Sequence, residues 1–342
     1  MSTLAVEIGW GWLLALKAVV ILAIVPAGAL LLGYTFLLKM MSHMQSRLGP
    51  MDPGGFHGWF QLIGDGIKFL QKEDIVPAEA DRRVFAMAPA VVGISTFLIF
   101  VVIPVGPRPV VANLDLGVFY ALAVSSLSVI GVLMAGWSSA NKFALIGALR
   151  AAAQLIAYEL PLLLAVVGVV IQAGTMSLQG IVAAQQDGSI FGWSGIGNPF
   201  ILTQFVGFLL FLTAAQAELT QTPFDMPVAE SELVAGYMVE YTGFRFLFFF
   251  IGEFGTATAF AAIAATLFLG GWSIPGVHGT AADLLGPIVL VTKLMAVAFI
   301  MFWVRFTYPR LREDQLQAVA WKYLIPIALA NVIVTAILKV AF

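Results

Sequence analysis

The sequence predicts an all-α integral membrane protein with about eight transmembrane helices. Hydrophobic residues make up 61% of its 342 residues, and charged residues only 11%. Soluble domains carry roughly 25% charged residues, so this chain lacks the polar surface that a water-facing globule needs. Its apolar segments are also long enough to cross a hydrocarbon core of ~30 Å, which takes about 20 helical residues. Proline and glycine cluster between these segments.

Eight apolar segments account for most of the chain, and each is interpreted as one membrane span. The first is longer than the apolar region of a cleavable signal, so we expect it to remain as a helix. Pro26 and Pro161 fall inside spans, where neighbouring helices can satisfy the freed carbonyl groups. In chain order, the predicted spans are residues 10–38, 84–104, 117–137, 152–174, 200–218, 244–270, 286–305 and 321–341.

Lysine and arginine gather on one side of these spans. Because positively charged loops stay in the cytoplasm, we expect both termini on the outer, periplasmic side of the cell inner membrane. The opposite loops contain only Arg108, while Lys17, Lys293 and Lys339 lie in the outer third of their spans and can extend outward. The cytoplasmic set is Lys39, Arg47, Lys68, Lys72, Arg82, Arg83, Lys142, Arg150, Arg245, Arg305, Arg310, Arg312 and Lys322.

Two predicted cytoplasmic loops, 39–83 and 218–243, are unusually long. In the first, apolar residues recur at helical spacing from Trp59 to Leu70, while Asp65, Lys68 and Lys72 supply a polar face. This pattern is typical of an amphipathic helix in the membrane interface. A loop helix packed on a partner protein would show the same pattern.

Acidic residues are concentrated where cations are missing. From Ala151 to Phe244 the chain has no lysine or arginine, yet five acids fall between residues 218 and 240. Inside the spans, Glu253 is expected about 13 Å and Glu159 roughly 10 Å from a helix start, at 1.5 Å per residue. A charge at the centre of a span costs about 2.5–3.5 kcal/mol, so such residues favour a proton path. The alternative is that they pair with arginine or lysine from other helices or subunits.

Metal and haem chemistry find few ligands in this chain. It has no cysteine, so no thiolate-held Fe–S cluster, structural zinc or disulfide is possible. A membrane haem needs axial ligands inside the membrane spans. The three histidines, His43, His57 and His278, all fall outside the predicted spans. We therefore expect no redox group and no metal bound by this chain.

One long motif and several shorter ones lie in order along the chain. The longest is Thr-Pro-Phe-Asp-Met-Pro-Val-Ala-Glu-Ser-Glu-Leu-Val-Ala-Gly-Tyr over residues 222–237. In these motifs the chain resembles the H-subunit family of bacterial complex I, NADH:quinone oxidoreductase. The shorter motifs are residues 45–50, 64–68, 72–74, 136–139, 147–154, 157–159, 239–241, 244–246, 252–254, 303–305 and 309–312.

The resemblance implies a role in a larger enzyme. In this family the helices and long cytoplasmic loops form the membrane end of a quinone tunnel, whose apolar walls suit an isoprenoid tail. A hydrophilic Fe–S-bearing subunit docks on the loops, and small membrane subunits and antiporter-like pumping subunits complete the membrane part. Quinone would be the substrate, while Fe–S clusters, FMN and NADH belong to partner subunits; no nucleic acid is involved.

Two sets of residues take roles by this resemblance. The tunnel access region comprises Arg47, Phe60, Asp65 and Lys68. A chain of acids linking the quinone site to the pumps comprises Glu159, Glu218, Asp225, Glu230, Glu232, Glu240 and Glu253. Loop 218–243 is the candidate element whose rearrangement would couple quinone reduction to protonation of these acids.

The chain departs from the family pattern in three places. Leu37 and Leu38 stand where the family usually has Glu-Arg, Gln221 where it has arginine, and Glu313 where it has tyrosine. Losing the arginine at 221 removes a local counter-charge for the acidic loop. These changes affect the charge balance near the tunnel and leave the architecture as expected.

Three other functions fit parts of the pattern. The same subunit could serve a complex I-like enzyme fed by ferredoxin or F420, because this subunit never meets the electron donor. A stand-alone proton or cation transporter would use the same acids and would work without partners. A structural membrane anchor would keep full activity of the assembled complex after Glu230, Glu232 and Glu253 are replaced by glutamine.

Overall fold

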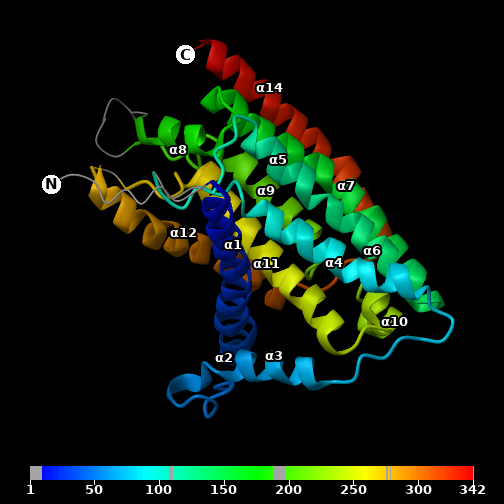
Figure 1. Ribbon diagram of the computed structural model, residues 1–342. Coiled ribbons are helices and arrows are strands. Elements are labelled where there is room, and N and C mark those ends of the chain that lie inside the picture. The colour runs from blue at the N-terminus through cyan, green and yellow to red at the C-terminus, as the bar shows by residue number, and fades with distance from the viewer. Residues whose placement is uncertain (1–9, 108–110, 188–196, 275, 278, 342) are drawn as a thin grey trace.

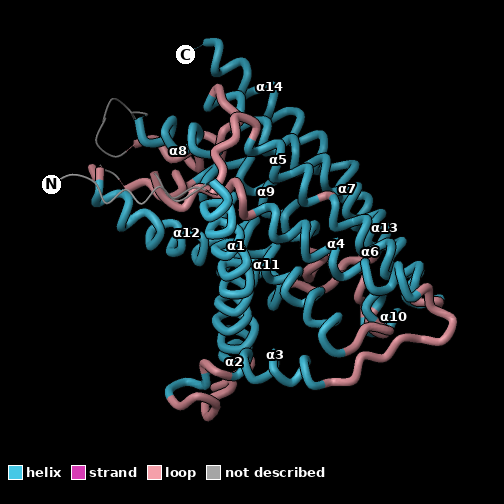
Figure 2. The backbone as a smooth tube through the Cα atoms, viewed as in Figure 1, coloured by secondary structure: helices cyan, strands magenta, loops and turns pink. Residues whose placement is uncertain are grey.

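The computed structural model describes residues 10–107, 111–187, 197–274, 276–277 and 279–341. All regular elements in these ranges are helical, and Figure 2 shows the helices joined by loops. The predicted all-α membrane fold is thereby confirmed. Arg108 and His278 lie outside the described residues.

Seven helical segments within the described ranges are long and apolar enough to cross a membrane. Each begins or ends near a cluster of glycine, proline or charged residues, as the sequence pattern predicts. Four are single helices: α4 (Arg82–Ile99), α7 (Lys142–Ala173), α11 (Gly243–Phe268) and α12 (Thr280–Thr307). The other three are composite segments, Ala15–Met44, Gly117–Ser138 and Glu313–Ala341.

The composite segments contain breaks that the sequence pattern does not show. Helix α1 (Trp10–Leu32) continues through a π-helical stretch, Gly33–Met40, into α2 (Met41–Met44). Helix α13 (Glu313–Ala318) likewise joins α14 (Ile325–Ala341) through a π-helical stretch, Val319–Leu324. Helices α5 (Gly117–Ser125) and α6 (Leu127–Ser138) meet at Ser126. A π-helical stretch widens the turn locally and re-aims the side chains that follow it.

The fifth predicted span, 200–218, is shorter in the structure. Helix α9 covers Phe205–Glu218, and its 14 residues rise only about 21 Å. Residues 200–203 form turns instead. Helix α9 packs against α7 and α14, which extend beyond it.

Helix α7 is longer than its predicted span and begins ten residues earlier. The Asn141 side chain caps it by accepting from the Phe143 N–H at 2.8 Å, and Gly174 ends it in the left-handed conformation. Its 32 residues rise about 48 Å, so its first turns project beyond a ~30 Å hydrocarbon core. Arg150 therefore lies on this helix and not in a loop.

Helix α3 (Gln61–Gln71) lies across the foot of α1, at the end of the molecule opposite the end of α14 (Figure 1). A short 3₁₀ turn, Phe56–Gly58, precedes it, and none of its residues is buried. Ile67 and Leu70 expose 47% and 59% of their surface. An exposed apolar stripe at the end of a transmembrane bundle suits the predicted interfacial helix.

Helices α7 and α11 form the centre of the bundle. Helix α11 packs against α1, α4 and α12, and α7 packs against α6, α9 and α14. Much of the buried surface of α11 consists of alanine from Ala257 to Ala265. Small residues allow the close helix approach that packing in lipid requires. The remaining helices, α8 (Leu178–Asp187), α10 (Glu230–Leu233) and a 3₁₀ turn (Gly236–Met238), belong to the connections.

Candidate functional site

The candidate site is built around the loop between α9 and α11, residues 219–242, which we call the acidic loop. This loop packs directly on α7 because two glycines face each other. A Cβ on Gly236 would lie 1.7 Å from the Pro227 carbonyl oxygen, and one on Gly147 would lie 2.7 Å from the Gly236 Cα. A side chain at Gly236 would therefore distort the loop itself, and one at Gly147 would push the loop away from α7.

Gln154 of α7 fixes the start of the acidic loop by hydrogen bonds. Its side-chain nitrogen donates to the carbonyl oxygens of Ala217 and Phe224, each at 2.7 Å. Gln154 is buried on α7, so the end of α9 and the first loop turn are fixed to that helix. This contact fixes the position of Glu218, the half-buried last residue of α9.

A small, partly open cavity of about 60 Å³ lies between the acidic loop, the end of α9 and helices α4, α6, α7 and α11. Glu218, Glu253 and Tyr237 line it together with apolar side chains such as Val92 and Phe249. A cavity needs roughly 10–15 Å³ of such volume per water molecule, so this one can hold more than one. The structure thus brings two of the predicted acids to one space that water can occupy.

Glu218 has the least compensated carboxylate of the set. Its Oε2 is buried and has no hydrogen-bond partner among the described residues. Glu159, near the middle of α7, is close enough to interact electrostatically with it. Like charges in a poorly solvated place oppose each other's ionisation, which is the setting that favours proton exchange.

Three amide oxygens near Glu218 also lack donors among the described residues. They belong to Gln154, Gln216 and Gln221, and all are buried. A buried acceptor normally has a donor, supplied by protein or water. The end of α9 therefore favours a bound water or a protonated carboxyl as the missing donor.

Glu253 on α11 is held by a cation from α12. Arg305 approaches its Oε1 to 3.0 Å, and the side-chain nitrogen of Gln221 lies 3.4 Å from the same oxygen. Arg305 is itself oriented by the rings of Phe254 and Phe302, whose centroids lie 5.8 Å and 5.7 Å from the guanidinium carbon. Glu253 has the ion pair that the alternative interpretation requires, while it also faces the cavity.

Asp225 and Tyr237 lie in the acidic loop close to Glu253. Burial raises the pKa of Asp225, and the Arg305 and Arg310 charges oppose that rise. Burial also raises the pKa of the Tyr237 phenol, with Glu253 and Asp225 acting in the same direction. Tyr237 is therefore a neutral hydroxyl at the cavity wall, able to donate and accept hydrogen bonds.

Glu232, by contrast, is bound by two arginines. Arg150 of α7 reaches it at 2.6 Å, and Arg310 forms a second short ion pair from the segment after α12. Arg150 also lies 3.6 Å from Glu313, the glutamate that departs from the family pattern. The hydrogen bond from Arg150 lowers the pKa of Glu232 below its ordinary value. This cluster joins three segments that are distant in sequence.

The remaining predicted acids have different surroundings. Glu240 accepts a hydrogen bond at 2.6 Å from the Asn141 amide that also caps α7. The side chain of Glu230 lies outside the described residues. Glu240 therefore faces the start of α7 and does not line the cavity.

The sequence suggested that the acidic cluster has no nearby counter-charge, but the structure supplies three arginines. Arg150, Arg305 and Arg310 come from outside the cation-free stretch and meet Glu232 and Glu253 in space. The sequence analysis allowed pairing with arginine or lysine from other helices, but it counted these three arginines as loop charges and did not identify them as the partners. Their signal was position: Arg150 and Arg305 lie at the ends of apolar spans, and Arg310 follows five residues after Arg305.

The four predicted tunnel residues lie around α3. Asp65 and Lys68 pair at 3.0 Å on exposed turns of that helix, Phe60 precedes it, and Arg47 is exposed after α2. None of the four lines the pocket of about 530 Å³ between the end of α3 and the start of α11. That pocket is formed by Phe69, Lys72, Glu73, Ile75, Tyr241, Thr242, Gly243 and Phe246.

Ion pairing fixes the two sides of this pocket. Arg245 of α11 binds Asp74 at 3.0 Å, and its guanidinium lies over the Phe85 ring at 5.2 Å. Thr242 accepts from the Ile75 N–H at 3.2 Å and donates to the Glu73 carbonyl at 3.1 Å. Among the described residues, no group of three or more histidine, aspartate or glutamate side chains is placed to hold a metal ion.

Comparison with known proteins decides the family. The family described as NADH dehydrogenase matches residues 16–336. The chain belongs to the NADH dehydrogenase family. The NADH-quinone oxidoreductase H subunit of Geobacillus kaustophilus (strain HTA426) is 43% identical over 341 residues, covering 100% of this chain and 96% of the relative. The H subunits of the same enzyme from Anaeromyxobacter dehalogenans (strain 2CP-C) and Anoxybacillus flavithermus (strain DSM 21510 / WK1) are 41% and 43% identical.

These matches cover most of each protein. They span 96% and 94% of this chain, and 83% and 92% of the two relatives. Membership of the NADH dehydrogenase family confirms the resemblance that the motifs around residues 222–237 indicate. The matched range also includes every described residue of the acidic loop and the cavity.

Proposed function

We propose that this chain is the quinone-site membrane subunit of a proton-translocating NADH:quinone oxidoreductase. Its relatives have that enzyme's name, and the chain matches them along almost its full length. In this proposal the end with α3 and the acidic loop faces the cytoplasm and contacts a hydrophilic Fe–S-bearing subunit. Both termini then lie on the periplasmic side, beside small membrane subunits and antiporter-like subunits.

The observation that supports coupling is the shared face of α11. Phe246 lines the pocket at α3, and Glu253 lines the small cavity beside the acidic loop. Seven residues separate them, which is two turns or about 10 Å along one helix face. A quinone headgroup bound in the α3 region, with Arg47, Phe60, Asp65 and Lys68 at its access, would act on the cavity acids over that distance.

The acids then have distinct roles in the proposal. Electrons reach the quinone from the partner's Fe–S cluster, and quinol formation also consumes protons. Glu218 exchanges protons with water in the cavity, next to Glu253 and Tyr237. Asp225, Glu230, Glu232 and Glu240 belong to the loop that transmits the change, and Glu159 continues the path into α7.

The test compares matched carboxylate variants in the assembled enzyme. Glu218→Gln keeps size and hydrogen-bonding groups but removes the exchangeable proton, so we expect at least a roughly tenfold loss of proton pumping. Asp314→Asn, which changes an exposed acid outside the acidic loop and the cavity, is the control and should retain most activity. NADH:quinone reductase activity and pH-gradient formation would be measured in the same membrane vesicles.

Equal pumping by the Glu218→Gln and control enzymes would contradict the proton path. Pumping by the purified chain alone in liposomes, without quinone, would instead support a stand-alone transporter. A complex that reduces quinone with ferredoxin or F420 and not with NADH would change the donor but leave the role of this chain intact.

A further inference from the structure

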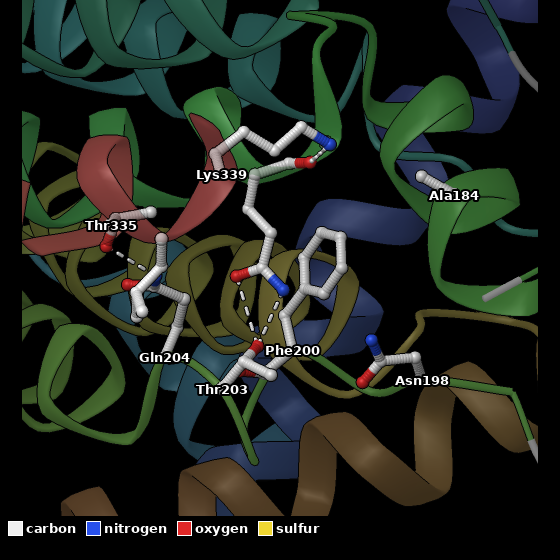
Figure 3. A pocket seen from close by; sticks show the side chains of 10 residues that line it. Ala184, Asn198, Phe200, Thr203, Gln204, Thr335 and Lys339 are labelled. Carbon is white, nitrogen blue, oxygen red and sulfur yellow. Dashed lines mark hydrogen bonds between the residues drawn. The ribbon is translucent and has the colours of Figure 1, made fainter. Parts of the chain in front are cut away.

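A second pocket lies at the end of the bundle away from the acidic loop. Its volume is about 440 Å³, and it lies among α7, α8, α14 and the segment before α9. Figure 3 shows Lys339 of α14 on one side, Thr203 and Gln204 on another, and Asn198 nearby. We call this the α9 recess.

The recess exists because α9 is short. Helix α9 rises only about 21 Å, while α7 and α14 continue past its first residue, Phe205. The turns of residues 200–203 fill only part of the space that a full span would occupy. The gap therefore lies between two long helices and opens near their ends.

The depth of the recess follows from two lysines on one continuous helical segment. Lys322 and Lys339 are separated by 17 residues, or about 26 Å along the axis. That distance is close to the ~30 Å thickness of the hydrocarbon core. Lys339 therefore lies near the headgroup level of the leaflet opposite Lys322.

Lys339 brings a positive charge to the rim of the recess. Its ammonium donates to the Gln172 carbonyl at 3.1 Å, near the end of α7. In the part of the chain that the structure describes, it forms no ion pair with a carboxylate. An ammonium has three donors, so this contact leaves others for an anion.

The inner wall of the recess is polar and held in place. Gln172 exchanges hydrogen bonds with Thr203 at 2.7 Å and 3.0 Å. Gln204 donates to Thr335 at 2.7 Å and accepts from Asn331 at 3.0 Å. Phe200, Ala184 and Leu338 supply the apolar part of the lining. A wall with both characters suits an amphipathic ligand.

We propose that the α9 recess binds an anionic phospholipid of the leaflet opposite the acidic loop. Its phosphate would accept hydrogen bonds from the Lys339 ammonium, and the Thr203 hydroxyl and Asn198 amide would lie near its glycerol oxygens. The acyl chains would run down the exposed faces of α14, where Val334 and Ile337 expose 54% and 61% of their surface. A charge-assisted hydrogen bond from an ammonium to a phosphate is stronger than one between neutral groups. The proposal does not depend on the proton path.

The test uses the complete complex, purified, stripped of lipid and placed in nanodiscs of phosphatidylcholine with added phosphatidylglycerol. For Lys339→Gln we expect roughly tenfold weaker phosphatidylglycerol binding, because a charge-assisted hydrogen bond is lost. Lys322→Gln, on the same helical segment at the other interface, is the matched control and should bind as the wild type does. Ala184→Phe, which fills the recess and keeps the charge, should also weaken binding.

A measurement on the wild-type complex makes the test independent of assembly of the variants. Photoactivatable phosphatidylglycerol should label peptides of α14 and α7 next to Lys339. Equal affinity of the Lys339→Gln and control complexes would overturn the proposal, as would labelling only elsewhere. Competition by inorganic phosphate would show a free-anion site, and cross-linking of Lys339 to another subunit would show a protein interface; either result also contradicts a lipid site.

Discussion

The acids of the loop and the acids of the cavity lie on the same side of the bundle, yet their charges are compensated in opposite ways. Glu232 is bound by Arg150 and Arg310, and its pKa is lowered. Glu218 has a buried oxygen with no partner among the described residues, and another carboxylate, Glu159, is its electrostatic neighbour. Glu253 is intermediate, with one arginine and one face on the cavity.

This difference separates two tasks that a count of acids cannot separate. A carboxylate held by two guanidinium groups remains charged and fixes geometry. A carboxylate that is poorly solvated and poorly compensated can gain and lose a proton near neutral pH. We infer that the ion pairs of the loop hold it on α7, while the cavity acids exchange protons. The following substitutions test whether the loop acids and the cavity acids have these separate roles.

The largest stability effect is expected for Arg305→Gln. This change leaves Glu253 facing the cavity without its cation, and breaking a partly buried pair costs about 2–3 kcal/mol. The thermal midpoint of the assembled complex should fall accordingly. Arg312→Gln is the matched control, since its pair with Asp314 is largely exposed and is worth at most about 1 kcal/mol. Equal effects of the two variants would show that Arg305 does not support Glu253.

A smaller and pH-dependent effect is expected for Glu232→Gln, of about 1 kcal/mol at neutral pH. Because the folded pKa of Glu232 lies below its ordinary value of 4.5, its contribution to stability is complete above that pH. It is lost as the pH falls through the lower folded value. The free energies of unfolding of the wild-type and Glu232→Gln proteins, measured as a function of pH, should therefore differ by a constant amount above about pH 4.5. This difference should shrink only at lower pH. A stability difference that increases as the pH falls would contradict the ion pairs assigned to Glu232.

The smallest effect is expected for Asn141→Ala. The variant loses the helix cap of α7 and the hydrogen bond to Glu240, worth together about 0.5–1 kcal/mol. Quinone reduction should be nearly unchanged, because Glu240 does not line the cavity. Asn141→Asp keeps the cap but places a second carboxylate beside Glu240, so it separates the two contacts. A large loss of activity in Asn141→Ala would show that the hydrogen bond between Asn141 and Glu240 is needed for coupling.

Much of the fold could be predicted because lipid imposes a simple rule on the sequence. Apolar runs of about 20 residues predict the long helices, and the pattern after Trp59 predicts α3. Hydropathy could not show that α9 begins only at Phe205 and has 14 residues, because the preceding segment from Pro199 to Gln204 is as apolar as many span ends. It also could not show that α7 begins at Lys142, because the charges of Lys142 and Arg150 resemble those of a cytoplasmic loop.

The candidate site was only half accessible from the sequence. The acids are visible because they interrupt apolar or cation-free stretches. Their partners are not, because Arg305 and Glu253 are brought together by packing of α12 on α11 and lie 52 residues apart. The carboxamide of Gln221 gives no charge signal at all, although it is buried beside Glu253. The partners of the outer lysines could not be predicted either: Lys17 and Lys293 donate to backbone carbonyls of distant loops at 2.6 Å and 2.9 Å.

The most direct test of the account is redox-difference infrared spectroscopy on the assembled complex. Reduction of the bound quinone should change a carboxyl C=O stretching band, because a cavity carboxyl gains or loses its proton. That band should disappear in Glu218→Gln and persist in Glu232→Gln. A band that is unchanged in Glu218→Gln and lost in Glu232→Gln would show that the exchangeable proton belongs to the ion-paired loop and would contradict the account.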